Sequence, residues 1–463
     1  MTGKFRREKD VLGEVEVPED AYWGVNTLRA VNNFKISARR FPAVFIASLA
    51  EVKKACLLAN MEQGSIDAEK GGALLTAMKE LLEEGKFQDQ FPIDIFQTGS
   101  GTQTNMNMNE VLANRANEIL GHPMGRKSPV HPNDHVNAAQ SSNDAIPAAM
   151  NLSALHAVNE TLLPAMGRLT DALKQKIEEF EGIVKVGRTH LQDAVPIPLS
   201  MEFRVYKRQA EAGASRITAA CEELMFLPLG GTAVGTGINA PAGFDRIAVK
   251  KLAEITGFPL KPNPVKAEGI ASHNPIAALS GALRQLALAL MKMANDVRWM
   301  GSGPRAGLFE LALPANEPGS SIMPGKINPT QSEALIQVCV QVMGNDAAIA
   351  MAEGFGSILD LNVCKPVMIC NLLDSAEILA NGADSFTEHC LKGLRANREH
   401  IESQLARSLM TVTNLSPYIG YDRCAQVAQQ AFRENKTIKE VIAELGIVIE
   451  GDIDALLDPG KMV

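Results

Sequence analysis

The pattern of apolar residues and prolines along the chain predicts several long helices. A proline inside a helix costs about 3 kcal/mol, so long segments without proline are candidate helices. Residues 276–303 contain no proline and are rich in Leu, Ala and Met on nearly every face. Similar runs cover residues 200–227, 330–365 and 367–416, and residues 148–184 are interrupted only by Pro164. Helices that are apolar all round must be surrounded, so we predict a mainly α fold with a central long-helix bundle rather than βαβ units.

The ends of the chain differ from this middle part. The head contains the short, mixed, turn-rich segment VLGEVEVPEDAYWGV, and the tail has breaks at Pro417 and Gly420 before the short amphipathic segment TIKEVIAEL. A chain of 463 residues also exceeds the usual size of one compact domain. We therefore predict an N-terminal mixed, mostly helical domain at 1–138, a central bundle domain at 139–396 and a small C-terminal helical domain at 397–463.

Composition narrows the possible partners and compartment. The net charge is −8, from 45 basic and 53 acidic residues, which argues against nucleic acid or an anionic membrane as a partner. No run of about eighteen consecutive apolar residues is present, and no secretory signal is visible, so we expect neither a spanning helix nor export. The seven cysteines are an odd number without a C-x-x-C pair, which is typical of buried, reduced thiols in a cytoplasmic protein.

One segment, Gly319–Pro329, combines features of an anion-binding loop. Its sequence GSSIMPGKINP holds two glycines, two serines, a lysine and an asparagine between prolines. Glycines let successive backbone N–H groups converge on an anion, and Lys326 adds a positive charge. Ser320 is a candidate nucleophile or base. A flexible surface loop is the alternative, but it explains only the glycines and serines.

Three further polar clusters interrupt the helical pattern. They are residues 98–107, residues 131–144 and residues 187–194. Their hydroxyls and amides can orient a small polar ligand without adding charge, although solvated turns have the same composition. His190 is a candidate acid or base, or else a structural hydrogen-bonding group. His131 and His135 lack a third ligand nearby, so we predict no metal site and no cofactor.

Two local patterns have structural explanations. Thr330-x-x-Glu333 fits a capping box, which would place the Gly319–Pro329 loop at a helix N-terminus. Gly235-x-Gly237-x-x-Ala240 resembles a dinucleotide-binding fingerprint, but no βαβ unit surrounds it. We interpret the latter as a turn where backbone segments pack closely.

Taken together, these segments resemble the fumarase/aspartase superfamily and, within it, the class II fumarate hydratases. Residues 319–329 match the superfamily signature GSSxMPxKxNP at every defined position, and the resemblance extends along nearly the whole chain. His190 and Gly325 favour fumarases, because aspartases typically have glutamine and alanine at these positions. The resemblance implies reversible, metal-independent anti addition of water to fumarate, giving L-malate. It also implies a three-domain subunit whose central helices form a homotetramer, with each active site shared between three chains.

The resemblance assigns roles residue by residue. Ser320 matches the base that removes the C3 proton of malate, and Lys326 and Asn328 match donors to the charge that then develops. One such donor is worth roughly 3 kcal/mol. His190, paired with Glu333 and acting through water, matches the group that protonates the leaving hydroxyl, although a capping box would compete for Glu333. The substrate-binding positions are Ser100, Thr102, Ser141, Ser142, Asn143, Thr189, Lys326 and Asn328, and a second, non-catalytic dicarboxylate site matches His131, Asn133 and Asp134.

Two alternatives remain open from the sequence. Near the start, Asp20-Ala21-Tyr22 is similar to aspartases, so aspartate ammonia-lyase or another fumarate-releasing lyase is the nearest rival. A non-catalytic structural protein on the same scaffold is a rival from another class. The presence of Ser320, Lys326, Asn328 and His190 argues against the second.

Overall fold

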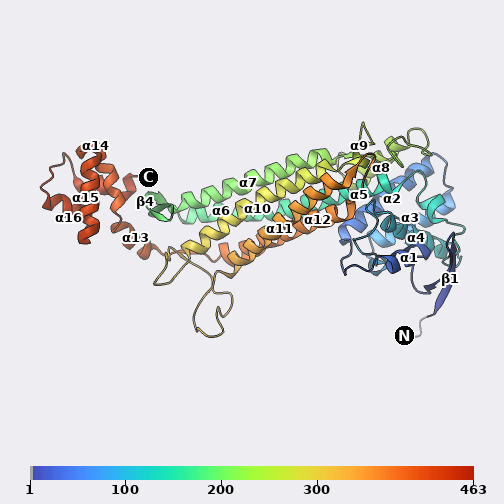
Figure 1. Cartoon of the computed structure of the whole chain (residues 1–463), viewed down its shortest axis with the longest axis horizontal. Coiled ribbons are helices and arrows are strands. Elements are labelled where there is room, and N and C mark those ends of the chain that lie inside the picture. The colour runs from blue at the N-terminus through green and yellow to red at the C-terminus, as the bar shows by residue number, and fades with distance from the viewer. Residues whose placement is uncertain (1–3) are drawn as a thin grey trace. The chain divides into compact units, whose positions relative to one another are not determined.

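A computed structural model describes residues 4–463, and helices dominate it (Figure 1). The chain forms two compact units, each built from segments far apart in the sequence. Unit 1 contains residues 1–164, 215–285 and 340–379, and unit 2 contains residues 165–214, 286–339 and 380–463. The mainly α fold predicted from the sequence is confirmed. The predicted boundaries near residues 138 and 396 divide the chain in sequence order, and that division stays a prediction.

Unit 1 is a helical body with short strands at its margins. Its helix α2 packs against α3, α5 and α8. The core side of α2 includes Phe45, Leu49 and Val52, which are fully buried. The elements that lie wholly in this unit are β1 (Phe5–Asp10), β2 (Gly13–Pro18), α1 (Val25–Asn33), α2 (Ala43–Glu62), α3 (Ala68–Leu82), η1 (Gln88–Gln90), α4 (Thr102–Ile119), η2 (Pro132–Val136), α5 (Ser142–His156), η3 (Ala157–Leu162), β5 (Phe226–Leu227), α8 (Phe244–Thr256), β6 (Lys261–Pro262), α9 (Glu268–Ala271), β8 (Ser357–Ile358) and β9 (Leu361–Asn362).

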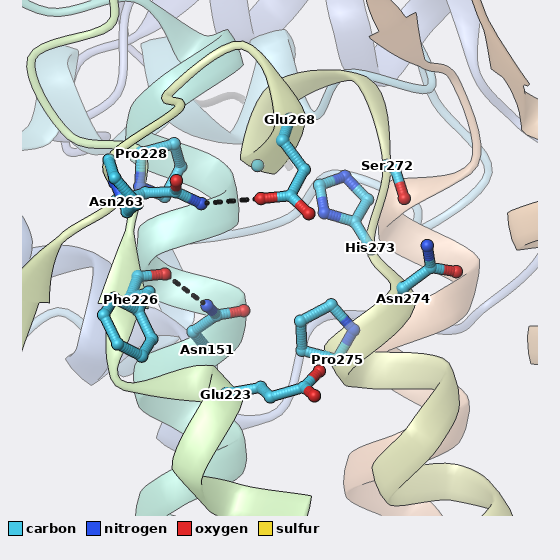
Figure 2. Close-up of a pocket in the computed structure, with 12 residues that line it drawn as sticks. Asn151, Glu223, Phe226, Pro228, Asn263, Glu268, Ser272, His273, Asn274 and Pro275 are labelled. Carbon is cyan, nitrogen blue, oxygen red and sulfur yellow. Dashed lines mark hydrogen bonds between the residues drawn. The ribbon is translucent and has the colours of Figure 1, made fainter.

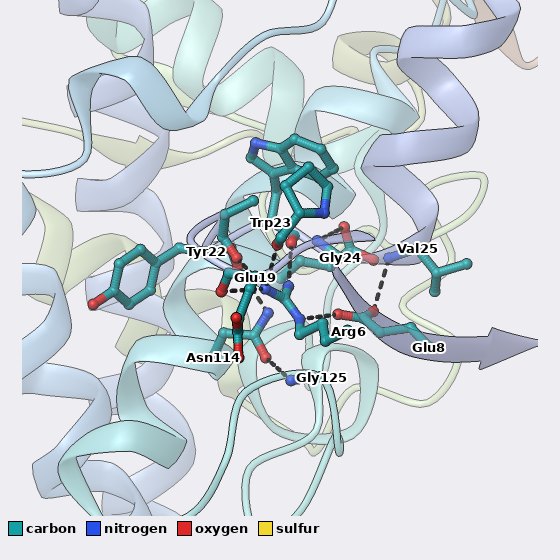
Figure 3. A network of polar contacts seen from close by, with 12 residues as sticks. Arg6, Glu8, Glu19, Tyr22, Trp23, Gly24, Val25, Asn114 and Gly125 are labelled. Atoms are coloured by element: carbon teal, nitrogen blue, oxygen red, sulfur yellow. Dashed lines mark hydrogen bonds and ion pairs between the residues drawn. The ribbon is translucent and has the colours of Figure 1, made fainter. Parts of the chain in front are cut away.

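The head of the chain is held by one arginine. The antiparallel strands β1 and β2 pair from Phe5↔Pro18 to Asp10↔Gly13. Arg6 donates hydrogen bonds to the backbone oxygens of Pro18, Glu19, Ala21 and Trp23 and to the Glu8 carboxylate (Figure 3). Four of these five hydrogen bonds therefore satisfy backbone oxygens in the segment that follows β2.

Unit 2 contains the β3–β4 hairpin and the tail. In this unit α7 and α10 pack closely, because a Cβ on Gly213 would lie 2.8 Å from Leu286 Cδ1. The tail has its own small core, which includes Leu415, Val427 and Val441. The elements of this unit are α6 (Leu163–Glu179), β3 (Val184–Thr189), β4 (Gln192–Pro198), β7 (Leu311–Ala312), η4 (Thr387–Leu391), β10 (Arg395–Ala396), α13 (Arg398–Ala406), η5 (Leu409–Leu415), α14 (Ser416–Ile419), α15 (Tyr421–Glu434), α16 (Ile438–Glu444), α17 (Ile453–Leu457) and η6 (Pro459–Lys461). Both units contain parts of α7 (Leu199–Leu224), α10 (Asn274–Met300), α11 (Thr330–Gly356) and α12 (Lys365–Phe386), and the first two residues of α6 lie in unit 1.

Two of the proline-free runs are not single helices, so those predictions were wrong in extent. α11 ends at Gly356 and is followed by the β8–β9 hairpin, and α12 ends at Phe386 before a π-helical turn and further short elements. A Cβ on Gly356 would lie 2.9 Å from Cys364 Sγ, so this glycine allows the returning hairpin to approach. Helices therefore end here without proline. The run at residues 148–184 begins earlier, at Ser142, and a π-helical turn precedes Pro164.

The helix α11 leaves an apolar stripe exposed in unit 1. Val340, Met351 and Phe355 are 57%, 63% and 82% exposed, and Gly344 and Ala347 between them are also exposed. By length and composition alone, α10 and α11 could each cross a membrane, a test that core helices of soluble proteins also pass. The spacing places the stripe on one face of α11, where it can pack against another helix.

Candidate active site

In unit 1 two helix N-termini meet through side-chain hydroxyls. Thr102 is the first residue of α4 and Ser142 is the first residue of α5. The Thr102 Oγ1 lies 2.8 Å from Ser142 Oγ and 2.8 Å from Ser100 Oγ. Helix N-termini carry partial positive charge and free N–H groups, so two of them beside three hydroxyls form a place for an anion. The predicted residues Ser100, Thr102 and Ser142 are thus brought together. The sequence-based view that residues 98–107 break the helical pattern is wrong from Thr102 onward.

The start of α5 is fixed by a buried carboxylate. Asp144 accepts the Ser141 N–H in a capping box, and its other oxygen accepts the N–H groups of Gly230 and Thr232 at 3.0 and 2.8 Å. Burial raises the pKa of Asp144, and the N–H groups and Lys53 lower it. The effect of burial is larger, so the pKa is about 6. Ser141 Oγ accepts the Asn143 N–H, so this hydroxyl has a structural role beside its predicted binding role.

Asn143 is held by the glycine-rich segment. Its Nδ2 donates to the Ala233 backbone oxygen at 2.9 Å. A Cβ on Gly235 would lie 2.4 Å from Ala267 Cα, so only glycine fits at this contact. This agrees with our interpretation of the segment as a turn where backbone segments pack closely.

A second buried cluster supports the loop that carries Ser100. A Cβ on Gly99 would lie 1.4 Å from the Val363 backbone oxygen, and the Lys365 N–H donates to the Gly99 oxygen at 3.0 Å. Lys365 is fully buried, and burial lowers its pKa to about 7. The Gly99 backbone, which precedes Ser100, therefore rests directly on residues 363–365.

A third buried group lies near the start of α5. Lys53 is fully buried and donates to Asn137 Oδ1 at 2.8 Å. Asn105 and Asn109 donate to the same oxygen. Burial lowers the pKa of Lys53 to about 8, while its interaction with Asp144 favours the charged form. Sequence reasoning missed Lys53, Asp144 and Gly99. Only the Ser141-x-x-Asp144 capping pattern offered a local signal.

The predicted second dicarboxylate site lies on a π-helical turn. His131 Nδ1 accepts the N–H groups of Asn133 and Asp134, both at 3.2 Å. Asn133 and Thr102 line the same cavity of about 580 Å³, together with Arg29 and Lys127. Arg29 is paired with Asp10, whereas Lys127 Nζ donates to the Lys9 backbone oxygen and makes no ion pair within residues 4–463. The cavity is therefore lined by two positively charged side chains and by the Asp10 carboxylate.

In unit 2, His190 occupies the tip of a hairpin in an unusual conformation. Strands β3 and β4 pair at Thr189↔Gln192, leaving a two-residue turn. His190 and Leu191 have φ of 56° and 59°, a geometry in which hairpins usually have Asn or Gly. Both side chains are exposed. Backbone strain of this kind is frequent at functional positions, which motivates a functional role for His190.

The base of this hairpin carries a buried charge cluster. Arg188 Nη1 lies 2.6 Å from Glu310 Oε1, and Lys185 Nζ lies 3.4 Å from Glu310 Oε2. Glu310 is fully buried. Arg188 also donates to Gln404 on α13 at 3.2 Å. Lys185 Nζ also lies 3.4 Å from Glu202 Oε1, so two cations and two carboxylates hold the strand that ends in Thr189. Sequence reasoning missed Glu310, because its partners are distant in the sequence.

The signature loop of residues 319–329 folds back on itself. Ser320 Oγ accepts the N–H groups of Ile322 and Met323 at 3.3 and 3.1 Å, an arrangement that would stabilise negative charge on this oxygen. Asn328 Nδ2 donates to the Gly319 oxygen, so this donor is engaged within the loop. Lys326 is exposed, and its side chain makes no ion pair within residues 4–463.

The capping box predicted for Thr330 and Glu333 is not formed. α11 begins at Thr330, and the Glu333 N–H bonds the Pro329 oxygen at 3.0 Å instead of the Thr330 hydroxyl. The helix therefore starts one residue earlier than the predicted cap requires. The exposed Glu333 carboxylate has no hydrogen bond in the described chain, and none joins it to His190. The competing explanation for Glu333 is thereby removed.

The predicted residues fall into two groups, one in each unit. Ser100, Thr102, Ser141, Ser142, Asn143 and the His131 turn belong to unit 1, whereas Thr189, His190, Ser320, Lys326, Asn328 and Glu333 belong to unit 2. Among residues 4–463, no three His, Cys, Asp or Glu side chains are grouped as a metal site. All seven cysteines are free, and six of them are buried.

Comparisons with known proteins define the class. A family model described as lyase matches residues 13–344, and one described as fumarase C C-terminus matches residues 412–463. The chain is a lyase of the fumarase/aspartase superfamily.

Whole-length relatives make the assignment more specific. Fumarate hydratase class II of Thermosynechococcus vestitus is 52% identical, covering 98% of this chain and 97% of the relative. The mitochondrial fumarate hydratase of Rhizopus oryzae is 48% identical over 99% of this chain and 93% of its own. The crystal structure of a class II fumarase from Schistosoma mansoni has a TM-score of 0.96 at 40% identity, covering 99% of both chains. The chain belongs to the class II fumarate hydratase family.

Proposed function

We propose that this chain catalyses the reversible, metal-independent anti addition of water to fumarate, giving L-malate. The observation that carries the proposal is the meeting of the α4 and α5 N-termini at the Thr102–Ser142 hydrogen bond. Together with Ser100 it provides hydroxyls and helix-end N–H groups for a carboxylate. Membership of the class II fumarate hydratase family supports the same reaction.

The proposed catalytic roles belong to the predicted residues of unit 2. In malate dehydration, Ser320 as the alkoxide takes the C3 proton, and the two N–H groups on its oxygen support that charged form. Negative charge then develops on the adjacent carboxylate, which Lys326 and Asn328 stabilise. His190, assisted by Glu333 through water, protonates the hydroxyl that leaves from C2. Ser141, Ser142, Asn143 and Thr189 bind the substrate with Ser100 and Thr102.

The assembly is also part of the proposal. A homotetramer in which three chains contribute to each site would cover the exposed α11 stripe at Val340, Met351 and Phe355. We also propose that each subunit has three domains, with boundaries near residues 138 and 396. The turn at His131, Asn133 and Asp134, beside the basic cavity, supports a second dicarboxylate site. The free, mostly buried cysteines favour a cytoplasmic location.

The test measures fumarate consumption by the purified chain. Loss of ultraviolet absorbance with formation of malate is expected, and its absence would overturn the proposal. Adding ammonium and looking for aspartate tests the nearest rival. Ser320→Ala should lower kcat by about 10² to 10⁴. The matched control Ser321→Ala removes the neighbouring hydroxyl and should lose far less. An equal or larger loss in Ser321→Ala would contradict the assignment of Ser320 as the base.

A further inference from the structure

A second polar cavity in unit 1 is used by none of the steps above. It has a volume of about 300 Å³ and lies between the end of α7, α9 and the start of α10 (Figure 2). Phe226, Pro228 and Pro275 form its apolar walls. Its polar side chains are Asn151, Glu223, Asn263, Glu268, Ser272, His273 and Asn274.

Three of these polar side chains are more than nine-tenths buried. Asn151, Asn263 and His273 are 7%, 7% and 3% exposed, yet they line an open cavity. Asn151 Oδ1 makes no hydrogen bond within residues 4–463, and Figure 2 shows it turned toward the open space. His273 Nε2 is also buried without a partner. Buried polar side chains normally have partners, so the unpaired Asn151 oxygen that faces the cavity points to a ligand.

Three of the side-chain donors of the wall are already engaged. Asn151 Nδ2 donates to the backbone oxygens of Leu224 and Phe226, and Asn263 Nδ2 donates to Glu268 at 3.3 Å. Ser272 Oγ donates to Glu353 at 2.6 Å. The Asn274 amide can still donate, whereas Asn151 Oδ1 and the carboxylates of Glu223 and Glu268 are acceptors, so a complementary ligand must supply donors.

The charge of the cavity is negative. Glu223 and Glu268 stand at its rim, and neither makes an ion pair in the described chain. Of the lysines close in sequence, Lys266 pairs with Asp245, and Lys261 lies over the ring of Phe226, a wall residue. Burial and Lys365 lower the pKa of His273 well below its usual value, so the imidazole is neutral near pH 7.

We propose that this cavity binds a small organic cation, an ammonium or guanidinium group on a short apolar stem. The cation would donate to the Glu223 and Glu268 carboxylates and to Asn151 Oδ1. The stem would pack on Pro228 and Pro275. This site is independent of the proposed hydration of fumarate.

Titration calorimetry on the full chain tests the proposal without using fumarate. Butylguanidinium should bind saturably at one site per chain, whereas butylurea, its neutral near-isostere, and the anion pentanoate should not. Glu223→Gln and Glu268→Gln should each weaken binding by about tenfold or more, because each removes a charge-assisted hydrogen bond. Glu222→Gln is the matched control, since it removes the same charge from the adjacent, exposed position of α7.

Three results would overturn the proposal. They are the absence of saturable binding at millimolar butylguanidinium, equal binding of butylurea, and an equal effect of Glu222→Gln. Circular dichroism and fumarate turnover confirm that each variant is folded. Because both rim carboxylates are exposed, their substitution should leave the fold intact.

Discussion

Substituting Gly319 by alanine should disable the signature loop by displacing its backbone. A Cβ at this position would lie 1.7 Å from the Lys326 backbone oxygen and 3.1 Å from the Asn328 N. Real Cβ atoms are essentially never found within 3.0 Å of a non-bonded atom outside the neighbouring residues. The first contact is with backbone, so no side-chain rotation relieves it. Ser320 directly follows Gly319 in the sequence, and Lys326 lies on the opposite side of the loop. The two groups assigned to proton removal and charge stabilisation must therefore move apart.

The size of the effect follows from the required movement. The Cβ and the oxygen have to separate from 1.7 Å to beyond 3.0 Å. A misplacement of roughly 1 Å at a reacting group can cost about 10²-fold in rate, so Gly319→Ala should lower kcat by at least that factor. Gly325→Ala is the matched control in the same loop. Its Cβ would meet no atom within 4 Å, and its φ of +79° adds a strain of about 1 to 2 kcal/mol.

The assay is the decrease of fumarate absorbance over a range of substrate concentrations, which separates kcat from KM. Circular dichroism and the midpoint of urea unfolding show whether each variant is folded. We expect Gly319→Ala to be folded but nearly inactive, and Gly325→Ala to retain most of its turnover. If the two variants turned over fumarate at rates within a few-fold of each other, the loop geometry would not matter as argued.

Three further outcomes are expected. Glu310→Gln leaves Arg188 without its buried counter-charge, so urea unfolding should show a loss of about 3 kcal/mol or more and kcat should fall. The pKa of Asp144 is raised from 3.8 to about 6, so its contribution to stability is full below 3.8 and is lost as pH rises through 6. Between pH 5 and 7 the free energy of unfolding of the unmodified chain should fall by about 1 kcal/mol relative to that of Asp144→Asn. A difference between the two free energies that does not change with pH would contradict the raised pKa. Ala347→Glu, on the exposed α11 stripe, should dissociate the proposed oligomer in light scattering; an unchanged mass would remove the stripe from the interface.

The long helices could be predicted because one strong physical rule governs them. Proline is excluded from helix interiors, and the apolar run at residues 276–303 became α10 with only small shifts at its ends. The same rule failed at Gly356, where the chain leaves the helix to make a hairpin against Cys364. A helix can end without proline when another segment needs the space, and the sequence near the end does not reveal that segment.

The candidate site could be predicted where it consists of local, chemically unusual segments. The residues 319–329 and the turn at His190 combine polar groups within a few positions. The supporting groups were not predictable in this way, since Glu310 and Arg188 are 122 positions apart and Asp144 binds Gly230 across 86. The capping box at Thr330 shows the opposite error. Its local pattern was correct, but the helix began at a different residue, so the expected hydrogen bonds do not exist.

The two groups of site residues have complementary chemistry. The unit 1 group offers hydroxyls, amides and two helix N-termini, which suit a carboxylate, but its buried Asp144 and Lys53 are committed to structural hydrogen bonds. The unit 2 group offers an exposed imidazole, an exposed lysine and a serine oxygen that accepts two N–H groups, which suit proton transfer. Hydration needs carboxylate binding and proton transfer at one substrate, because the acid and the base can act only on a substrate that is held in place. Neither group supplies both functions, so the proposed site needs residues of both groups, and the proposed homotetramer allows different chains to supply them.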